Sequence, residues 1–451
     1  MSLEQPDRVA TLIKRKMGLP EYGRLVAGRE FRPETLSAVI LKKLVQDAEL
    51  QLGPISGCVI TVPAYFDDTR RKATMDAGRI AGLNVLDIID EPSAAALAYS
   101  VGSSALQSQT VLVYDLGGGT FDVTLVKLGK KRFQVLAIEG DVRLGGRDWD
   151  DRLVGWVAER FVKEFGSDPR SDPQSEAMLQ AAAERAKRTL SKVEQTSVTI
   201  GHDGHRLTLP ITRSEFENLT RDLLIRTRLT AQQVLTQAGL TWPQVDKVLM
   251  VGGSTHMPAT GRMLAELTGR EPDRSVAVSE VVARGAAVHA GLVNARTSPE
   301  PATRTSEPPG EIVEISVNAH SLGVQVRHGD EQLNHKLVRK NTQLPASAEE
   351  VYYTVTENQS RVRVRILQGE AQQAEACIPV GECWIEGLPE HLPKGSPVRV
   401  RCGVAANGRI EITATDLTSG RAATASIHRP GGLTDQELSR EAAWLRNVRV
   451  Q

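Results

Sequence analysis

The sequence has few aromatic residues, few cysteines and no excess of charge of either sign. Aromatic residues make up 4% of the 451 residues, and the 55 Lys and Arg residues equal the 55 Asp and Glu residues. This balance argues against binding to nucleic acid or to an anionic membrane through bulk charge. Cys58, Cys377, Cys383 and Cys402 show no Cys-x-x-Cys pairing. We therefore expect free thiols in a reducing compartment, because a metal site would need ligands that the sequence does not provide.

Long hydrophobic runs are also missing. No apolar run approaches the ~18 residues of a membrane span, and the N-terminal residues carry both signs of charge without an apolar signal core. We therefore expect a cytoplasmic protein with no membrane partner. The apolar fraction of 40% is sufficient for buried cores, and the length allows about three units of ~150 residues.

Strand-like and helix-like segments alternate over residues 1–293. Apolar residues recur at helical spacing in residues 33–52, residues 58–62 form a short apolar run, and Asp67 offers an N-cap to a helix that runs toward Gly82. Further strands are expected at residues 110–116, 121–128, 133–139 and 245–251, and further helices at residues 92–99, 147–165, 174–191 and 213–238. This alternation predicts an α/β domain.

The pattern changes after this first domain. Residues 294–311 are rich in Pro, Ser and Thr and are expected to form an extended linker. Residues 312–428 show short alternating segments, such as residues 361–367, separated by turn signals such as Asn407-Gly408. They predict a smaller all-β module. Residues 429–451 are expected to form the start of a C-terminal helix.

The segment Asp115-Leu-Gly-Gly-Gly-Thr-Phe-Asp122 is the most informative part of the chain. Two apolar runs flank its three glycines, and Thr120 and Asp122 open the second run. Glycine N–H groups can approach a ligand with no Cβ in the way, and a row of them suits phosphate oxygens. Carboxylates at strand ends suit Mg²⁺, usually through water. The segment predicts half of a phosphate clamp in an ATPase, and a tight hairpin turn is the alternative.

Two weaker motifs point the same way. The segment Val251-Gly-Gly-Ser-Thr255 joins a strand to a helix expected near Pro258. Such a turn can pack against a base, ribose or phosphate, although glycines are common at strand–helix joints. Lys14 lies in a basic run before Gly18. A lysine that reaches a terminal phosphate or the attacking water recurs in phosphoryl transfer, and a basic surface turn is the alternative.

One helix face carries a possible nucleoside site. Glu184, Lys187, Arg188 and Ser191 fall at i, i+3, i+4 and i+7 and share this face. Glu184 and Lys187 could hold ribose hydroxyls, Arg188 could stack on adenine, and Ser191 could bond the base edge. A solvated face with intrahelical ion pairs is the alternative, and judged alone the segment favours it.

Taken together, these motifs make the chain similar to DnaK-type chaperones of the seventy-kilodalton heat-shock family along almost its whole length. The matching phrases are Val59-Ile-Thr-Val-Pro-Ala-Tyr-Phe66, Asp76-Ala-Gly-Arg-Ile-Ala-Gly-Leu83, Glu91-Pro-Ser-Ala-Ala-Ala-Leu-Ala-Tyr99, the Asp115 to Asp122 segment, Leu144-Gly-Gly146, Glu184 to Ser191, Val251 to Thr255, Asn358-Gln-Ser360 and Leu367-Gln-Gly-Glu370. The resemblance implies an α/β, actin-like ATPase domain followed by an all-β sandwich domain that binds extended peptides.

The resemblance also implies roles for individual residues. The catalytic set comprises Lys14, Glu91, Asp115, Thr120 and Asp122, with Asp115 and Asp122 holding Mg²⁺ through water. The pocket for ATP or ADP comprises Gly117, Gly118, Gly119, Thr120, Glu184, Lys187, Arg188, Ser191, Gly252, Gly253, Ser254 and His256. The peptide groove comprises Val324, Tyr352, Val355, Val362 and Val364. For Val362 and Val364, ordinary sandwich core is the alternative.

The implied partners are unfolded or extended polypeptides, a J-domain co-chaperone and a nucleotide exchange factor. Leu86-Asp87 occupies a place that is usually basic and that docks J-domain partners, which argues against that docking. His256 stands where Arg is usual, Ser279 where Asp is usual, and Arg327 where an apolar residue arches over the groove.

Two departures concern whole segments. The family's first strand pair, which carries the other half of the phosphate clamp, has no counterpart before Lys14. We therefore expect an ATPase domain that is incomplete at its N-terminus and that hydrolyses ATP slowly or not at all. The leucine-rich acidic linker is replaced by residues 294–311, and we find no residues with which this segment would dock on the ATPase domain. We expect peptide release that is fast and only weakly controlled by ATP.

The sequence thus favours an ATP-dependent chaperone that acts in protein folding and the stress response. The first alternative is a nucleotide- and peptide-binding protein that has lost turnover. The second is a sugar kinase or cell-shape filament protein with the same ATPase fold. The all-β module at residues 312–428 argues against the second alternative, because those classes lack it.

Overall fold

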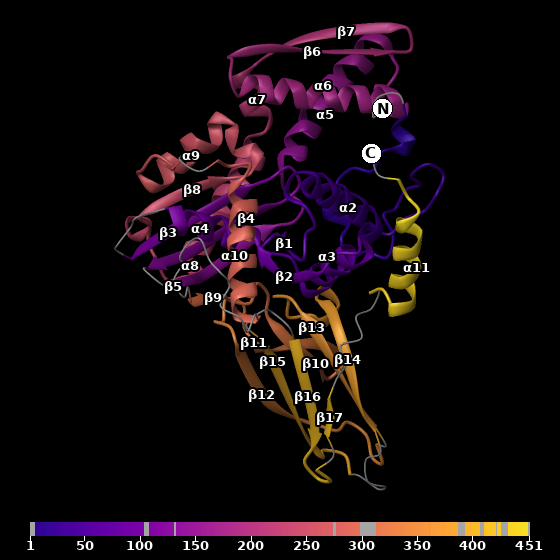
Figure 1. The fold of residues 1–451 in the computed structure, drawn as a ribbon, viewed down its shortest axis with the longest axis vertical. Helices are drawn as coiled ribbons and strands as arrows, with labels where there is room; N and C mark the ends of the chain where they lie inside the picture. Colours follow the sequence, from indigo (N-terminus) through magenta and orange to yellow (C-terminus); the bar gives the residue numbers. More distant parts are fainter. Residues whose placement is uncertain are drawn as a thin grey trace.

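The computed structural model places two parts one above the other, a mixed α/β part and a smaller β part (Figure 1). Between β10 and β17, the described residues of the β part contain no α-helix, and α11 (Asp435–Arg446) returns to the α/β part. The structure describes residues 5–102, 108–129, 132–273, 277–297, 313–359, 361–386, 393–405, 410–420, 422–424 and 432–449. The predicted turn at Asn407-Gly408 lies outside these residues.

A five-stranded sheet forms the centre of the α/β part. Its order is β8 (Lys247–Val251), β3 (Gln109–Leu116), β4 (Phe121–Gly129), β5 (Arg132–Asp141) and β9 (Val313–Ile315). Alternate residues of β3 enter two separate cores, because side chains on a strand point to opposite faces. Leu112 and Tyr114 pack on one face, and Val111 and Val113 pack on the other. The predicted strands at residues 110–116, 121–128 and 133–139 are confirmed.

Helices cover both faces of this sheet. The core on the face of Leu112 includes residues of α5 (Gly146–Phe165), α6 (Pro173–Leu190), α8 (Arg221–Gln237) and α9 (Pro258–Thr268). The opposite core includes residues of α4 (Glu91–Gly102) and α10 (Val281–Thr297). Above these helices, β6 (Gln195–His202) and β7 (His205–Thr212) form a hairpin at one end of the molecule (Figure 1).

Two expected boundaries were wrong. The helix expected at residues 213–238 is divided into α7 (Arg213–Leu219) and α8, because Thr220 leaves helical geometry at ψ 11°. Helix α10 continues to Thr297, past the expected end of the domain at residue 293. Residues 294–297 can adopt helical geometry, because the first proline of the following segment comes after them. The remainder of the expected linker, residues 298–311, lies outside the described residues.

A smaller two-stranded sheet lies beside the central sheet. It pairs β1 (Cys58–Val62) with β2 (Val85–Asp90) in parallel and packs with α2 (Pro33–Leu52) and α3 (Asp68–Ile80). Asp67 accepts a hydrogen bond from the backbone N–H of Arg70, so the predicted N-cap is confirmed. Next to this sheet, the short helix α1 (Ile13–Lys16) contacts α2.

The β part contains two four-stranded sheets with one shared core. The first sheet has the order β11 (Glu331–Val338), β10 (Leu322–His328), β13 (Arg361–Gln368) and β14 (Ile378–Glu386). The second has the order β12 (Ala346–Tyr353), β15 (Pro397–Val404), β16 (Ile410–Asp416) and β17 (Ala422–Thr424). Both sheets contribute to the core, for example through Val324, Ile366, Val400 and Ile412. Cys58, Cys377 and Cys402 are free thiols.

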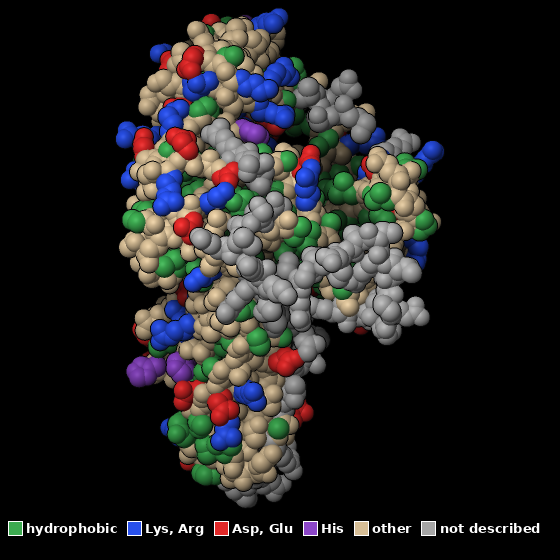
Figure 2. Space-filling view, turned by 60° about the vertical axis from the view of Figure 1, so that its left-hand side comes forward, with side chains coloured by type: hydrophobic (Ala, Val, Ile, Leu, Met, Phe, Trp, Pro, Cys, Tyr) green, Lys and Arg blue, Asp and Glu red, His purple; other side chains and the backbone are tan. Residues whose placement is uncertain are grey.

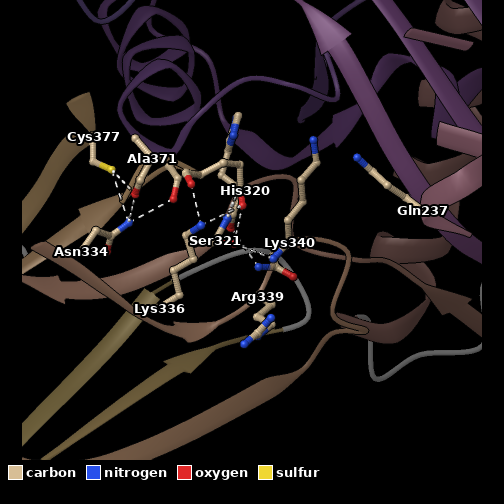
Figure 3. Close-up of polar contacts among 12 residues, drawn as sticks. Gln237, His320, Ser321, Asn334, Lys336, Arg339, Lys340, Ala371 and Cys377 are labelled. Atoms are coloured by element: carbon tan, nitrogen blue, oxygen red, sulfur yellow. Dashed lines mark hydrogen bonds and ion pairs between the residues drawn. The ribbon is translucent and has the colours of Figure 1, made fainter. Parts of the chain in front are cut away.

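Side chains join the two parts directly (Figure 3). Lys340 forms an ion pair with Glu139, both nearly buried, and its ammonium lies 4.5 Å from the centre of the Tyr65 ring. His320 Nε2 donates to the carbonyl oxygen of Tyr65 at 3.0 Å. Asn341 Oδ1 accepts from the N–H of Ile138, and its Nδ2 donates to Gln237.

Backbone pairing adds to these contacts, because β9 pairs with β5. Residues 313–315, which the pattern assigned to the β module, are therefore a strand of the central sheet. The two parts meet over a substantial set of polar contacts, which the sequence did not lead us to expect.

In space-filling view, Lys and Arg side chains are interspersed with Asp and Glu side chains over the visible face (Figure 2).

Candidate functional site

The turn between β3 and β4 places the predicted catalytic carboxylates side by side. Asp115 and Asp122 are direct partners in the antiparallel register, and both are buried. Gly117 donates its N–H to the carbonyl oxygen of Thr120 at 3.0 Å, which closes the turn. The segment is therefore a tight hairpin, as the structural alternative supposed, and it also gathers carboxylates as the clamp hypothesis supposed.

Lys14 and Glu91 complete a charged cluster with these two aspartates. Lys14 Nζ donates to both carboxylate oxygens of Glu91, at 2.6 and 2.9 Å. Burial, and then the charge of Glu91, raises the pKa of Asp122 to about 7, although the N–H of Tyr65 donates to this carboxylate. Burial, and then the charges of Glu91 and Asp122, raises the pKa of Asp115 well above its usual range.

Burial makes the ionised forms of Asp115 and Asp122 unfavourable, and the negative charge of Glu91 adds to this effect. A cation bound nearby would remove that penalty, so the donor set fits Mg²⁺. Among the described residues, no group of three or more His, Cys, Asp or Glu side chains is arranged to hold a metal ion. Coordination through water by Asp115 and Asp122 stays a prediction.

Arg15 belongs to this site, although the sequence analysis missed it. Its Nε donates to the carbonyl oxygen of Gly119 at 2.6 Å, and its guanidinium forms an ion pair with Asp148 at the start of α5. The side chain therefore ties α1 to the glycine turn. A guanidinium is a strong phosphate ligand. The basic run that contains Lys14 was the available signal, but it did not distinguish Arg15 from its neighbours.

Three glycine-rich segments converge at the β3–β4 turn. Gly146 donates its N–H to the carbonyl oxygen of Gly117 at 2.9 Å, and Ser254 Oγ donates to the same oxygen at 2.9 Å. Gly252 has φ +83°, and a Cβ there would lie 2.5 Å from the carbonyl oxygen of Leu116. Apart from Gly118 and its two chain neighbours, no heavy atom of the described residues lies within 4 Å of a Cβ built at Gly118. The turn is tightly packed behind and open at Gly118, which fits a phosphate chain.

The predicted nucleoside face divides into two groups. Lys187 Nζ donates to the carbonyl oxygen of Gly146 at 2.8 Å and forms an ion pair with Asp150. Burial raises the pKa of Asp150 to about 6 despite this lysine. Glu184 and Arg188 are 56% and 77% exposed and lie 3.8 Å apart, as the solvated alternative expects.

The remaining two nucleoside candidates are placed differently. Ser191 Oγ donates to the carbonyl oxygen of Lys187, and His256 is exposed. The structure thus brings Lys187 and Ser254 to the glycine turns. It leaves Glu184, Arg188 and His256 at the surface, so their contacts with a nucleoside stay predictions.

In the β part, the predicted peptide residues line one groove of about 750 Å³. All five of them, Val324, Tyr352, Val355, Val362 and Val364, are in its wall. Val324 and Val364 also belong to the core shared by the two sheets, so these two valines both fill the core and line the groove. Val355 is 57% exposed.

The groove lies where β10 and β13 separate. These strands pair only over Leu322–Val324, although β10 continues to His328 and β13 begins at Arg361. Their other edges are occupied by β11 and β14. Beyond Val324, the two strand edges therefore face the groove with backbone groups that an extended peptide could pair with.

Asp87, which stands in the predicted docking place for a J-domain, lies at the junction of the two parts. His289 Nε2 lies 3.0 Å from Asp87 Oδ2, and both residues line a cavity of about 210 Å³ between the parts. Arg71, from α3, lines the same cavity and forms an ion pair with Asp90. The carboxylate of Asp87 is thus engaged within the chain.

Comparison with known proteins shows the family of the chain and several similar proteins. The family described as "Hsp70 protein" matches residues 7–446. The chain is 41% identical over 425 residues to the "Chaperone protein DnaK" of Thermus thermophilus, which covers 92% of this chain and 66% of that protein. It is 41% identical over 424 residues to the "Chaperone protein DnaK" of Deinococcus proteolyticus, with 92% and 65% covered.

A relative from Synechococcus elongatus, "Chaperone protein dnaK3", is 41% identical over 420 residues, with 91% of this chain and 54% of that protein covered. The chain thus spans between about half and just under two thirds of the length of these relatives. Within the part of the chain that the structure describes, no helix combines the length and apolar character needed to span a membrane.

Proposed function

The chain belongs to the Hsp70 protein family, and from this premise we propose that it is an ATP-dependent molecular chaperone. The α/β part is the actin-like nucleotide-binding domain, and the two-sheet β part is a sandwich that binds extended apolar segments of unfolded proteins. The domain division, residues 1–293 and 312–428, is part of this proposal, with the end of α10 (to Thr297) and β9 assigned to the first domain. The observation that carries it is the convergence of Lys14, Glu91, Asp115 and Asp122 at a glycine turn open at Gly118.

Each residue has a role that follows from its position. ATP would supply the phosphoanhydride, and Mg²⁺ would neutralise phosphate charge and favour ionised Asp115 and Asp122. Lys14, held by Glu91, places an ammonium where it can orient the attacking water. Thr120 is buried beside the turn and offers a hydroxyl to the terminal phosphate. Arg15 adds a cation at Gly119.

The clients of the groove are unfolded or extended polypeptides. The separated edges of β10 and β13 supply main-chain hydrogen bonds, and Val324, Val362 and Val364 supply an apolar wall. A nucleotide exchange factor and a J-domain co-chaperone remain proposed partners. The contact of Asp87 with His289 argues against a J-domain docking at Asp87 itself.

The decisive experiment is single-turnover ATP cleavage by purified protein with Mg²⁺. We expect cleavage by the wild type and a loss of about 100-fold or more in Lys14→Ala and in Thr120→Ala, because positioning and charge stabilisation supply most of the rate. The matched control is Lys163→Ala, which removes an exposed lysine from the outer face of α5 and should cleave at the wild-type rate.

Two outcomes would count against the proposal. Cleavage that survives in both site variants would show that the activity resides elsewhere. Saturable ATP binding without any cleavage by the wild type would favour the alternative, a nucleotide- and peptide-binding protein that has lost turnover.

A further inference from the structure

Basic side chains surround the opening between β10 and β13. Arg327, Arg363 and Lys394 line the groove of about 750 Å³, and Arg327, Arg363 and Arg365 line an adjoining hollow of about 210 Å³. None of the described residues that line either space is Asp or Glu. The walls that would contact a peptide are therefore apolar and cationic.

Two nearby carboxylates offset only part of this charge. Arg363 Nε donates to Glu382 Oε2 at 2.8 Å, and this contact lowers the pKa of Glu382, so the glutamate is ionised. Arg327 lies 3.5 Å from Asp330, but both side chains are largely exposed and such pairs are weak.

Arg365 contacts a neutral partner, since its Nη1 donates to Gln325 Oε1 at 3.3 Å. Lys394 lies in the loop before β15, next to Gly395, whose N–H donates to the carbonyl oxygen of Thr354 in the groove wall. The four cations Arg327, Arg363, Arg365 and Lys394 thus exceed the two carboxylates in contact with them, which leaves the opening positively charged.

We propose that this groove selects extended apolar segments that are flanked by acidic residues. This inference rests on the proposed function of the groove and names its substrate class. Main-chain pairing with β10 and β13 does not distinguish one sequence from another, and the valine wall selects apolar side chains. Charge at the rim then decides between segments of equal apolar content, because complementary charge favours one partner and like charge penalises the other.

Fluorescence anisotropy with the full chain tests the inference. Three labelled peptides share one Leu-rich apolar core and carry Glu, Gln or Lys residues on both sides. We expect the Glu-flanked peptide to bind about tenfold more tightly than the Lys-flanked peptide at low salt, since several exposed charge contacts change sign together. At about 1 M salt the difference should fall to about twofold, because exposed charges are screened.

Variants that remove positive charge from the groove test which residues produce the preference for acidic flanks. Combining Arg327→Gln with Lys394→Gln should at least halve the logarithm of the ratio of affinities for the Glu-flanked and Lys-flanked peptides. The affinity for the Gln-flanked peptide should stay within about twofold of its wild-type value. The control is Arg399→Gln, which removes an exposed arginine from β15 on the face opposite Val398 and Val400, two residues of the groove wall. This variant should keep the wild-type ratio.

The outcomes separate this inference from the proposed function. Saturable binding of all three peptides with equal affinity, or tighter binding of the Lys-flanked peptide, would overturn the acidic preference and leave the peptide-binding groove intact. Failure of all three peptides to bind would overturn both. An affinity ratio that falls equally in the Arg399→Gln control would show that the charge of the whole module, and not the groove, produces the preference.

Discussion

Among single residues, Asp122 shows most clearly that a buried carboxylate of the site lowers the stability of the folded protein. Its carboxylate is buried next to Asp115 and feels the charge of Glu91, so its pKa rises from 3.8 to about 7. Because the folded protein holds this proton more tightly than the unfolded chain, the folded state binds more protons between these two values. Stability therefore falls as pH rises from about 4 to about 7 and stays reduced above that range.

Asp122→Asn should relieve this penalty. We expect the variant to unfold at a higher temperature than the wild type at pH 8, with a gain on the order of 2–4 kcal/mol, and to lose ATP cleavage. The gain should vanish near pH 4, where Asp122 of the folded wild type is protonated. Thermal melts across this pH range check it, with Asp151→Asn, at an exposed carboxylate on α5, as control. A gain that does not depend on pH would contradict the assignment.

The sequence identified site residues where the proposed chemistry requires a particular residue type. Asp115, Thr120 and Asp122 were recognisable because glycines and strand ends surround them. Arg15 was missed because its contacts with Gly119 and Asp148 join segments that lie far apart in the sequence. Local spacing carries no information about such a contact.

At the scale of the element, the separation of β10 from β13 creates the groove. The strands pair at Val324 and Ile366 and then diverge, so the same valines that fill the core also form the wall of an opening. Sequence alternation predicted the strands and which side chains share a face. It could not predict the divergence, because a strand pattern does not specify where a neighbouring strand stops pairing.

Val362→Phe should block this groove. Val362 lines it and is only partly buried, so a ring at this position would extend into the peptide space. We expect peptide affinity to fall about tenfold or more, with a cost in stability of about 1–3 kcal/mol if the ring also strains the core. Anisotropy titration and a thermal melt measure the two effects separately.

The matched control for this substitution is Ile378→Phe, at a 39% exposed position on β14 that does not line the groove. It also introduces an aromatic ring into the same sheet and should leave peptide affinity unchanged. Wild-type affinity in Val362→Phe would place the peptide site elsewhere in the β part.

For the whole molecule, the contacts between the two parts change the expectation about coupling. The sequence led us to expect little control of peptide release by ATP, since residues 294–311 lack apolar docking residues. The structure shows that docking uses other residues: Lys340 with Glu139, His320 with Tyr65, and β9 with β5. None of these pairs is close in sequence, so a motif in the linker could not have predicted them.

Lys340→Met should weaken this docking, because the buried carboxylate of Glu139 loses its cationic partner and keeps the neutral donors Gln233 and Gln237. We expect ATP to accelerate peptide release about fivefold or more in the wild type and much less in the variant. Release rates with and without ATP measure this, and Lys336→Met, whose lysine contacts Glu370 within the β part, serves as control. Equal ATP acceleration in Lys340→Met and the wild type would show that coupling takes another route.

The position of α11 has a consequence for how the chain is made. Leu433 and Leu445 share a buried cluster with Met17, Ala38 and Phe66, and Lys42 Nζ donates to the carbonyl oxygen of Leu445. This cluster joins α2 and α11, which lie far apart in the sequence. During synthesis from the N-terminus, the surface of α2 and α3 therefore stays exposed until α11 emerges. While the intervening residues are translated, the growing chain therefore presents unfinished apolar surface, the condition that makes growing chains prone to aggregate.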